Sequence, residues 1–156
     1  MLNNISEMIE IKRKLKELRN EHWLNEAFLS FNWCFLLLIT ILPWLIWWKF
    51  VDKKFLYRII CYGAFVSIFS ILLDDIGSYY LLWIYQYQLV PITPRLNPID
   101  LSVMPVTYMF VYQYFKKWKT FAIAQTILAF GAAFLCEPIF IWMDIYKPIN
   151  WKLTFS

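Results

Sequence analysis

The sequence predicts an all-α fold, namely an integral membrane helical bundle of four transmembrane helices preceded by an amphipathic N-terminal helix. Composition is the first observation: 61% of the 156 residues are hydrophobic and 17% are charged, whereas soluble domains are about half apolar and about a quarter charged. The second is charge placement, because ten charged residues, out of 15 basic and 11 acidic ones, fall within the first 26 positions. The third is the long apolar runs that follow, which exclude disorder and argue against one soluble domain.

Residues 1–26 are predicted to be separate from the transmembrane domain, residues 27–156. Within them, residues 3–26 combine apolar positions at helical spacing with a balanced set of acidic and basic side chains. The apolar positions are Ile5, Met8, Ile9, Leu15 and Leu18. Such a helix lies on the membrane surface or packs on a partner.

Four spans are expected to follow. Ala27–Trp48 carries no charge, and the second span begins after Lys54 and continues through Asp74 toward Tyr80. A Pro-rich link at 90–98 cannot be regular helix and is predicted to be a loop. The third span is Ile99–Phe115, bent at Pro105, and the fourth is Thr120–Tyr146, which contains Pro138.

Basic residues indicate the orientation. The short loops 49–58 and 116–119 hold seven Lys and Arg residues, whereas the long loop between the second and third spans holds only Arg95. The positive-inside rule therefore predicts that both short loops face the cytoplasm, with both termini outside. Because the basic residues lie at the ends of apolar runs, they fit membrane topology and not nucleic-acid binding.

One polar residue in each predicted span lies roughly 24–30 Å from the basic end of that span, at 1.5 Å per residue. These residues are Asn32, Asp74, Asp100 and Glu137. Buried acids inside membranes are usually functional, so this level is the candidate site for a cation or a proton.

The helix faces refine this candidate site. Asp74 continues a stripe of small residues that starts at Gly63 and lets helices approach closely, while Asp75 is about 100° away and is expected to meet headgroups or a loop. Glu137 stands directly before Pro138, which frees the carbonyl of Phe134.

Structural interpretations stay open for the same residues. Asp100 follows Asn97-Pro98 and fits helix capping, which is the favoured interpretation of this residue. Small residues of the fourth span indicate helix packing; they are Ala122, Ala129, Ala132, Ala133 and Cys136. Aromatic residues after Asp74, including Trp83 and Tyr85, indicate an interfacial belt or, less often, walls for an organic cation.

No cofactor and no metal is expected. The three cysteines, Cys34, Cys61 and Cys136, lie in apolar runs without CxxC spacing or histidine partners. The sequence contains no GxSxG, P-loop, dinucleotide fingerprint or HExxH motif.

Several short motifs occur in a specific order along the chain. They are Leu42–Lys49, Leu72–Gly77, Asp100–Pro105, Tyr112–Phe115, Glu137-Pro138 and Asn150-Trp151-Lys152. This order resembles a family of small uncharacterised multi-span membrane proteins from spore-forming Gram-positive bacteria. The resemblance implies a bacterial plasma-membrane protein and carries no mechanism. It also implies one further apolar span after the Asn-Trp-Lys element in members of that family, which would place the C-terminus in the cytoplasm.

Three functions are compatible with these residues. The first is a non-enzymatic membrane protein, either a small transporter-like or channel-like unit or a helper subunit, with an acidic site near the outer face. A bundle this small would favour a homo-oligomer or a larger membrane complex in the lipid bilayer. The second is a membrane enzyme acting on a lipid or isoprenoid, with Asp74 and Glu137 as acid and base. The third is a purely structural subunit, in which the acids lie apart, each paired or capping.

Overall fold

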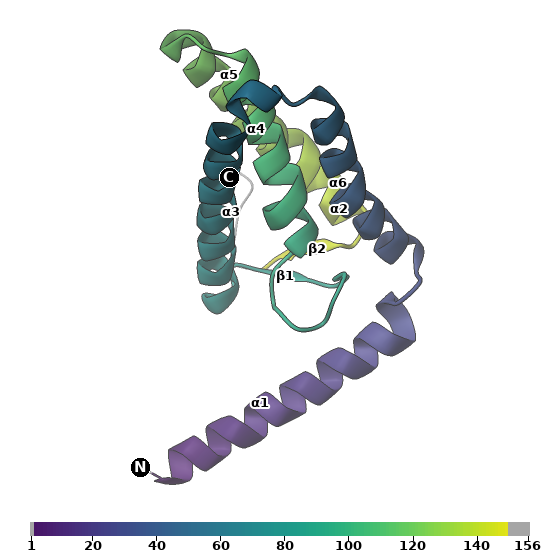
Figure 1. The fold of residues 1–156 in the computed structure, drawn as a ribbon. Coiled ribbons are helices and arrows are strands. Elements are labelled where there is room, and N and C mark those ends of the chain that lie inside the picture. The colour runs from purple at the N-terminus through teal and green to yellow at the C-terminus, as the bar shows by residue number, and fades with distance from the viewer. Residues whose placement is uncertain (1, 150–156) are drawn as a thin grey trace.

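The structure is a computed structural model and describes residues 2–149, of which helices make up 78%. The predicted helical fold is therefore confirmed (Figure 1). The α-helices are α1 (Leu2–His22), α2 (Phe31–Phe50), α3 (Leu56–Tyr79), α4 (Met104–Tyr114), α5 (Trp118–Gly131) and α6 (Glu137–Trp142). Two short strands, β1 (Trp83–Tyr85) and β2 (Tyr146–Pro148), pair antiparallel and were not expected. The Asn150-Trp151-Lys152 element lies outside the described residues.

Three helices are long and apolar enough to cross a membrane: Phe31–Phe50, Lys53–Tyr79 and Trp118–Trp142. The last combines α5 and α6, which a π-helical turn at Ala132–Cys136 joins without a break. The predicted third span, 99–115, is also helical, with a π-helical turn at Ile99–Val103 that continues into α4. With 16 residues it is shorter than the other three and is not among the helices of membrane length.

The ends of the predicted spans need two corrections. The first span begins at Phe31 and not at Ala27, because the Ser30 hydroxyl accepts a hydrogen bond from the backbone N–H of Trp33 at 3.2 Å and caps α2. The fourth ends at Trp142, because Asp144 adopts a left-handed conformation with φ 56° and turns the chain into β2. The Pro-rich link at 90–98 is confirmed as a loop up to Leu96.

The two short basic loops lie at the same end of the bundle (Figure 1). The Gln113 side chain near the end of α4 ties the first of these loops to α4, because it accepts from the backbone N–H of Asp52 and donates to the carbonyl of Phe50, both at 3.0 Å. The Pro-rich loop, the strand pair and α1 lie at the other end. There Trp23, the residue directly after α1, donates its indole N–H to the carbonyl of Gln88, just before the Pro-rich loop, at 3.0 Å.

The interior is small and centres on the helix 99–114. Val106 and Met109 of α4 pack with Trp47, Val51 and Ile59. Gly63 permits this contact, since a Cβ there would collide with the Met109 side chain. The small stripe that the sequence predicts on α3 thus faces α4, as expected for closely packed membrane helices.

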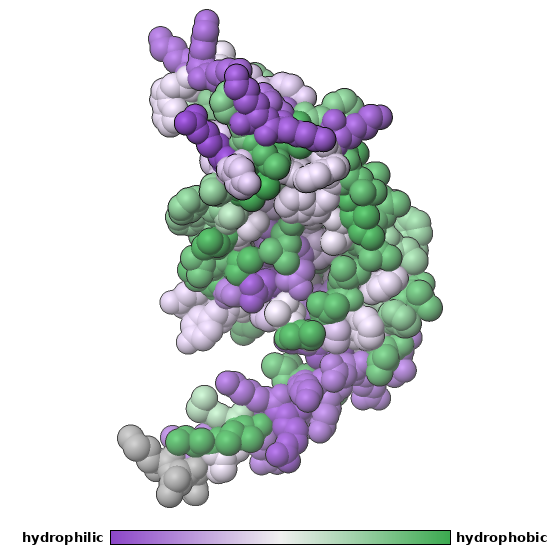
Figure 2. All heavy atoms as spheres, viewed as in Figure 1, coloured by the Kyte–Doolittle hydropathy of each residue, from purple (hydrophilic) through white to green (hydrophobic). Residues whose placement is uncertain are grey.

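Most apolar side chains face outward instead. In the apolar windows of the three long helices, only 11%, 11% and 0% of the residues are buried within the chain. Figure 2 shows hydrophobic side chains over the middle of the bundle and hydrophilic ones along α1 and at the end formed by the short loops. Such a surface is too apolar for water and suits a hydrocarbon solvent.

The π-helical turns at Ile99–Val103 and Ala132–Cys136 each lead directly into an α-helix that has a proline as its second residue. Pro105 and Pro138 each lack an N–H, so the carbonyl four residues earlier loses its usual helical partner. For Pro105 that carbonyl belongs to Leu101, and it accepts a hydrogen bond from the Trp44 indole N–H at 3.1 Å. The predicted irregularity at these prolines therefore takes the form of widened turns, which are frequent at functional sites.

Candidate functional site

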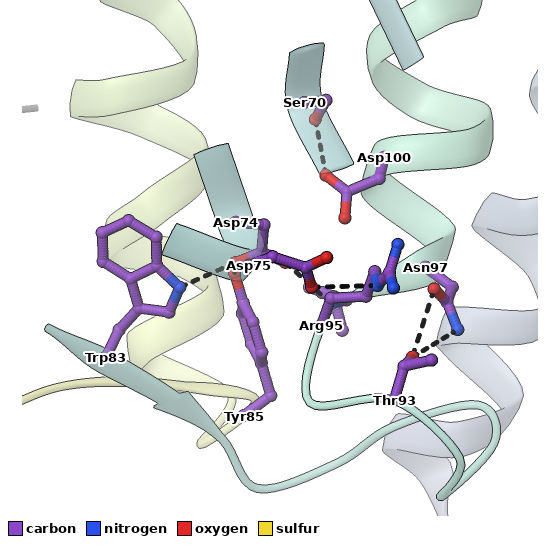
Figure 3. Close-up of polar contacts among 10 residues, drawn as sticks. Ser70, Asp74, Asp75, Trp83, Tyr85, Thr93, Arg95, Asn97 and Asp100 are labelled. Atoms are coloured by element: carbon purple, nitrogen blue, oxygen red, sulfur yellow. Dashed lines mark hydrogen bonds and ion pairs between the residues drawn. The ribbon is translucent and has the colours of Figure 1, made fainter. Parts of the chain in front are cut away.

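The Asp74 carboxylate accepts three hydrogen bonds (Figure 3). It is 7% exposed, and its Oδ1 atom accepts hydrogen bonds from the Trp83 indole N–H and the Tyr85 hydroxyl, both at 2.7 Å. Its Oδ2 atom accepts from the backbone N–H of Leu96 at 3.1 Å. Because these donors come from β1 and from the Pro-rich loop, Asp74 clasps both segments to the end of α3.

Asp75 behaves as the sequence predicts. Its carboxylate lies 3.3 Å from Nε of Arg95 in the Pro-rich loop, and the Asp75 side chain is 41% exposed. Adjacent positions on one helix thus serve different purposes: Asp74 holds buried donors, and Asp75 forms a surface ion pair with the loop.

Asp100 is more deeply buried than Asp74, at 4% exposure. Its Oδ1 atom accepts from the Ser70 hydroxyl of α3 at 2.5 Å. The capping interpretation is wrong, because this carboxylate makes no cap hydrogen bond and points across to α3. The side chains of Asp74 and Arg95 lie near it, and its Oδ2 atom is buried without a hydrogen-bond partner among residues 2–149.

Glu137 is the first residue of α6 and is half-buried. Its Oε1 atom is likewise buried with no hydrogen-bond partner in the described part of the chain. The position before Pro138, which the sequence singles out, therefore carries a carboxylate that the surrounding protein satisfies only in part.

Asp100 and Glu137 line the same cavity, which has a volume of about 390 Å³ and lies between α4 and the α5–α6 helix. Its polar lining also includes Trp83, Tyr85, Tyr108 and Tyr146. The remaining lining is apolar or small. A volume of this size is within the range of sites for small organic ligands.

The cavity exists because the facing helix presents small side chains. Ala129, Ala132, Ala133 and Cys136 line it. The sequence-based interpretation of these residues as a packing stripe needs correction here, because they border open space instead of holding a neighbouring helix. Their short side chains leave the volume that Asp100 and Glu137 help to line.

Tyr85, which donates to Asp74, and Tyr146 both line the cavity. Burial raises the pKa of the Tyr85 hydroxyl well above its usual value, and the nearby charge of Asp74 raises it further. Burial and then the charge of Glu137 raise the pKa of Tyr146. The two rings lie 5.8 Å apart between their centroids. Both hydroxyls therefore keep their protons at neutral pH and remain donors beside the carboxylates.

Asn32 does not join this group. Its side-chain amide donates to the carbonyl of Met143 at 2.9 Å and so ties α2 to the chain just after α6. Of the four residues that the depth argument selects, Asp100 and Glu137 line the cavity. Asp74 does not line it but bonds to Tyr85 and Trp83, which do. Asn32 lies outside the cavity and links α2 to the segment after α6.

Sequence reasoning placed Ser70 only on the small polar face of the second span that leads to Asp74. It missed Tyr108 and Tyr146, and it favoured an interfacial belt for Trp83 and Tyr85. The structure gives these two residues a specific contact that the belt interpretation did not include, because both donate to Asp74. The sequence did contain an indication of this contact, because Trp83 and Tyr85, whose side chains can donate hydrogen bonds, follow Asp74 closely along the chain.

In the part of the chain that the structure describes, no three His, Cys, Asp or Glu side chains form a group that could hold a metal ion. No protein-family model, curated protein or solved structure matches this chain. Fold and site together define a helical protein with three membrane-length helices and an acidic cavity walled by aromatic and small side chains.

Proposed function

We propose that this chain is a multi-pass protein of the bacterial plasma membrane that binds a cation in the acidic cavity. In this proposal it is non-enzymatic and acts as a small transporter-like unit or as a helper subunit of a larger complex. One observation carries the proposal: the buried oxygens Oδ2 of Asp100 and Oε1 of Glu137 lack donors, and both residues line the same cavity.

The membrane placement is supported by the outward-facing apolar side chains and by the three membrane-length helices. The helix 99–114 runs between the two ends of the bundle and would make the fourth crossing (Figure 1). Both basic loops lie at one end, so the positive-inside rule assigns loops 49–58 and 116–119 to the cytoplasm. The cavity then opens nearer the outer face.

A cation suits the cavity for electrostatic reasons. Burying a carboxylate oxygen without a partner costs free energy, and a bound cation would recover that cost. Tyrosine and tryptophan rings in the lining attract organic cations through their negative faces. Since the walls are otherwise apolar, a small organic ammonium ion fits the cavity better than a hydrated metal ion.

The test is direct binding to the purified full chain in a neutral detergent, by calorimetry, with methylammonium, tetramethylammonium, sodium and potassium as probes. We expect Asp100→Asn and Glu137→Gln each to weaken organic cation binding by about tenfold or more, the loss expected for one charge-assisted contact. Asp144→Asn is the matched control, because it removes a carboxylate that lies outside the cavity and pairs with Lys147 at 3.7 Å. Equal affinities in all three variants would refute the cation site.

A membrane enzyme is the second candidate, favoured by the same cavity because two carboxylates converge beside apolar walls. Asp100 and Glu137 would then act as acid and base on a lipid or isoprenoid. Mass spectrometry of bacterial lipids incubated with the chain distinguishes the two functions. A product that both Asp100→Asn and Glu137→Gln abolish would favour the enzyme. A purely structural role accounts for Asp74, whose oxygens all have donors, but leaves the two unpartnered oxygens unexplained.

A further inference from the structure

A second hollow, of about 660 Å³, lies at the basic end of the bundle, away from the acidic cavity. It is formed by the start of α3, the end of α4 and the turn into α5. Two cationic side chains line it, Arg58 from α3 and Lys116 from the turn. Neither cation forms an ion pair within residues 2–149.

The charge around this hollow is strongly one-sided. Seven Lys and Arg residues belong to the two loops at this end, and Asp52 is the single acid among them. Asp52 also lines the hollow, and its carboxylate accepts a hydrogen bond from the backbone N–H of Lys54 at 3.0 Å. An anion entering the hollow would therefore meet two cations against one carboxylate in the lining, within a surrounding surface of net positive charge.

The hollow is held in shape by the chain itself. Gln113 lines it and bonds to the backbone of both Phe50 and Asp52, which fixes the loop before α3 to the end of α4. Arg58 and Lys116 thus come from segments whose relative position is set by hydrogen bonds and not by their own long side chains.

The walls between the two cations are aromatic. Tyr112 stacks on Tyr62 with ring centroids 4.7 Å apart, and it meets Phe121 edge-on at 6.4 Å. Trp118 stacks on Phe121 at 5.9 Å and is 79% exposed, at the first residue of a membrane-length helix. An exposed tryptophan at such a position is typical of the level of lipid headgroups.

We propose that this hollow binds the phosphate of an anionic phospholipid headgroup, with Arg58 and Lys116 as its charged donors and the acyl chains along the aromatic wall. Arginine offers paired N–H groups that match phosphate oxygens, and lysine adds a point charge. A lipid is favoured over free phosphate because the charged rim adjoins apolar and aromatic walls, which inorganic phosphate would not use. This lipid site rests on the membrane placement proposed above and is independent of the cation in the other cavity.

The experiment uses the full chain in a neutral detergent and measures binding of short-chain phosphatidylglycerol, phosphatidylcholine and inorganic phosphate through tryptophan fluorescence. We expect phosphatidylglycerol to bind about tenfold more tightly than phosphatidylcholine. Arg58→Gln and Lys116→Gln should each weaken phosphatidylglycerol binding by about tenfold, the loss of one charge-assisted contact. Lys119→Gln is the matched control, because it removes the same charge at the same end but from outside the hollow.

Three results would overturn the lipid site: equal binding of the two lipids, equal losses in Arg58→Gln and Lys119→Gln, or displacement of the lipid by phosphate at the lipid's own concentration. The last result would indicate a site for free phosphate. Since both lining cations extend from the surface, the variants should unfold at the wild-type temperature and retain methylammonium binding. Loss of lipid binding with methylammonium binding intact separates this site from the cation site, and recovery of the chain in the membrane fraction tests the placement itself.

Discussion

Replacing Asp74 tests whether one buried carboxylate holds the Pro-rich loop and β1 to the bundle. In Asp74→Ala, the Trp83 indole, the Tyr85 hydroxyl and the Leu96 N–H all lose their acceptor. An unsatisfied buried donor costs about 1–3 kcal/mol, whereas hydrogen bonds within membrane proteins average about 0.6 kcal/mol. Three such contacts, one fully buried and two partly buried, therefore predict a loss of about 2–4 kcal/mol in the free energy of unfolding.

A neighbouring residue and a conservative change supply the controls. Asp75→Ala removes a half-exposed ion pair and should cost less than about 1 kcal/mol. Asp74→Asn should fall between, because its amide oxygen can accept from two donors while its NH₂ group faces the Leu96 N–H.

Unfolding of the full chain in mixed detergent, followed by tryptophan fluorescence, measures these differences, and hydrogen exchange at Leu96 reports the loop contact directly. The reasoning fails if Asp74→Ala lies within about 0.5 kcal/mol of wild type, or if Asp75→Ala costs as much.

Two further predictions concern Gly77, which packs against Trp83, and the Tyr85 hydroxyl. Gly77→Ala places a Cβ into the Trp83 ring, so the free energy of unfolding should fall by about 1–3 kcal/mol and tryptophan emission should change. In the control Gly131→Ala the added Cβ meets open space and should stabilise α5 by up to about 1 kcal/mol. An unfolding temperature higher for Gly77→Ala than for Gly131→Ala would contradict this prediction. Tyr85 has a raised pKa in the folded protein, so its contribution to stability is complete below about pH 10 and is lost as pH rises through the folded value. Wild type should therefore lose more stability than Tyr85→Phe above about pH 10, and parallel melting curves would argue against a protonated donor.

The helices were predictable because their signals are local. Apolar runs of membrane length, the prolines and the charge clusters indicated where helices run and where the Pro-rich loop interrupts them. Their ends were less accurate, since they depend on single residues such as Ser30 at the start of α2 and Asp144 after α6. The number of membrane crossings also remains a prediction, because the helix 99–114 is short and partly enclosed by its neighbours.

The level of the acids along the bundle could be predicted, but their partners could not. Counting 1.5 Å per residue brings Asp74, Asp100 and Glu137 to a common depth. It cannot say that Ser70 meets Asp100, or that Tyr85 stands between Asp74 and the cavity, because these contacts depend on how three helices and a strand pair rotate against one another. The helix-capping interpretation of Asp100 failed for the same reason.

By itself, therefore, the sequence determined an apolar helical bundle whose charges gather in an N-terminal helix and in two short basic loops, with a few acids inside or beside the apolar runs. These properties follow from composition and from helical periodicity, which involve residues near one another in the chain. Only the tertiary structure decided which acids have donors for all their oxygens and which ones line a cavity with an oxygen left unpartnered. That distinction depends on the donors that distant segments bring to each oxygen, and on the space left where Ala132 and Ala133 face α4 with side chains too short to fill it.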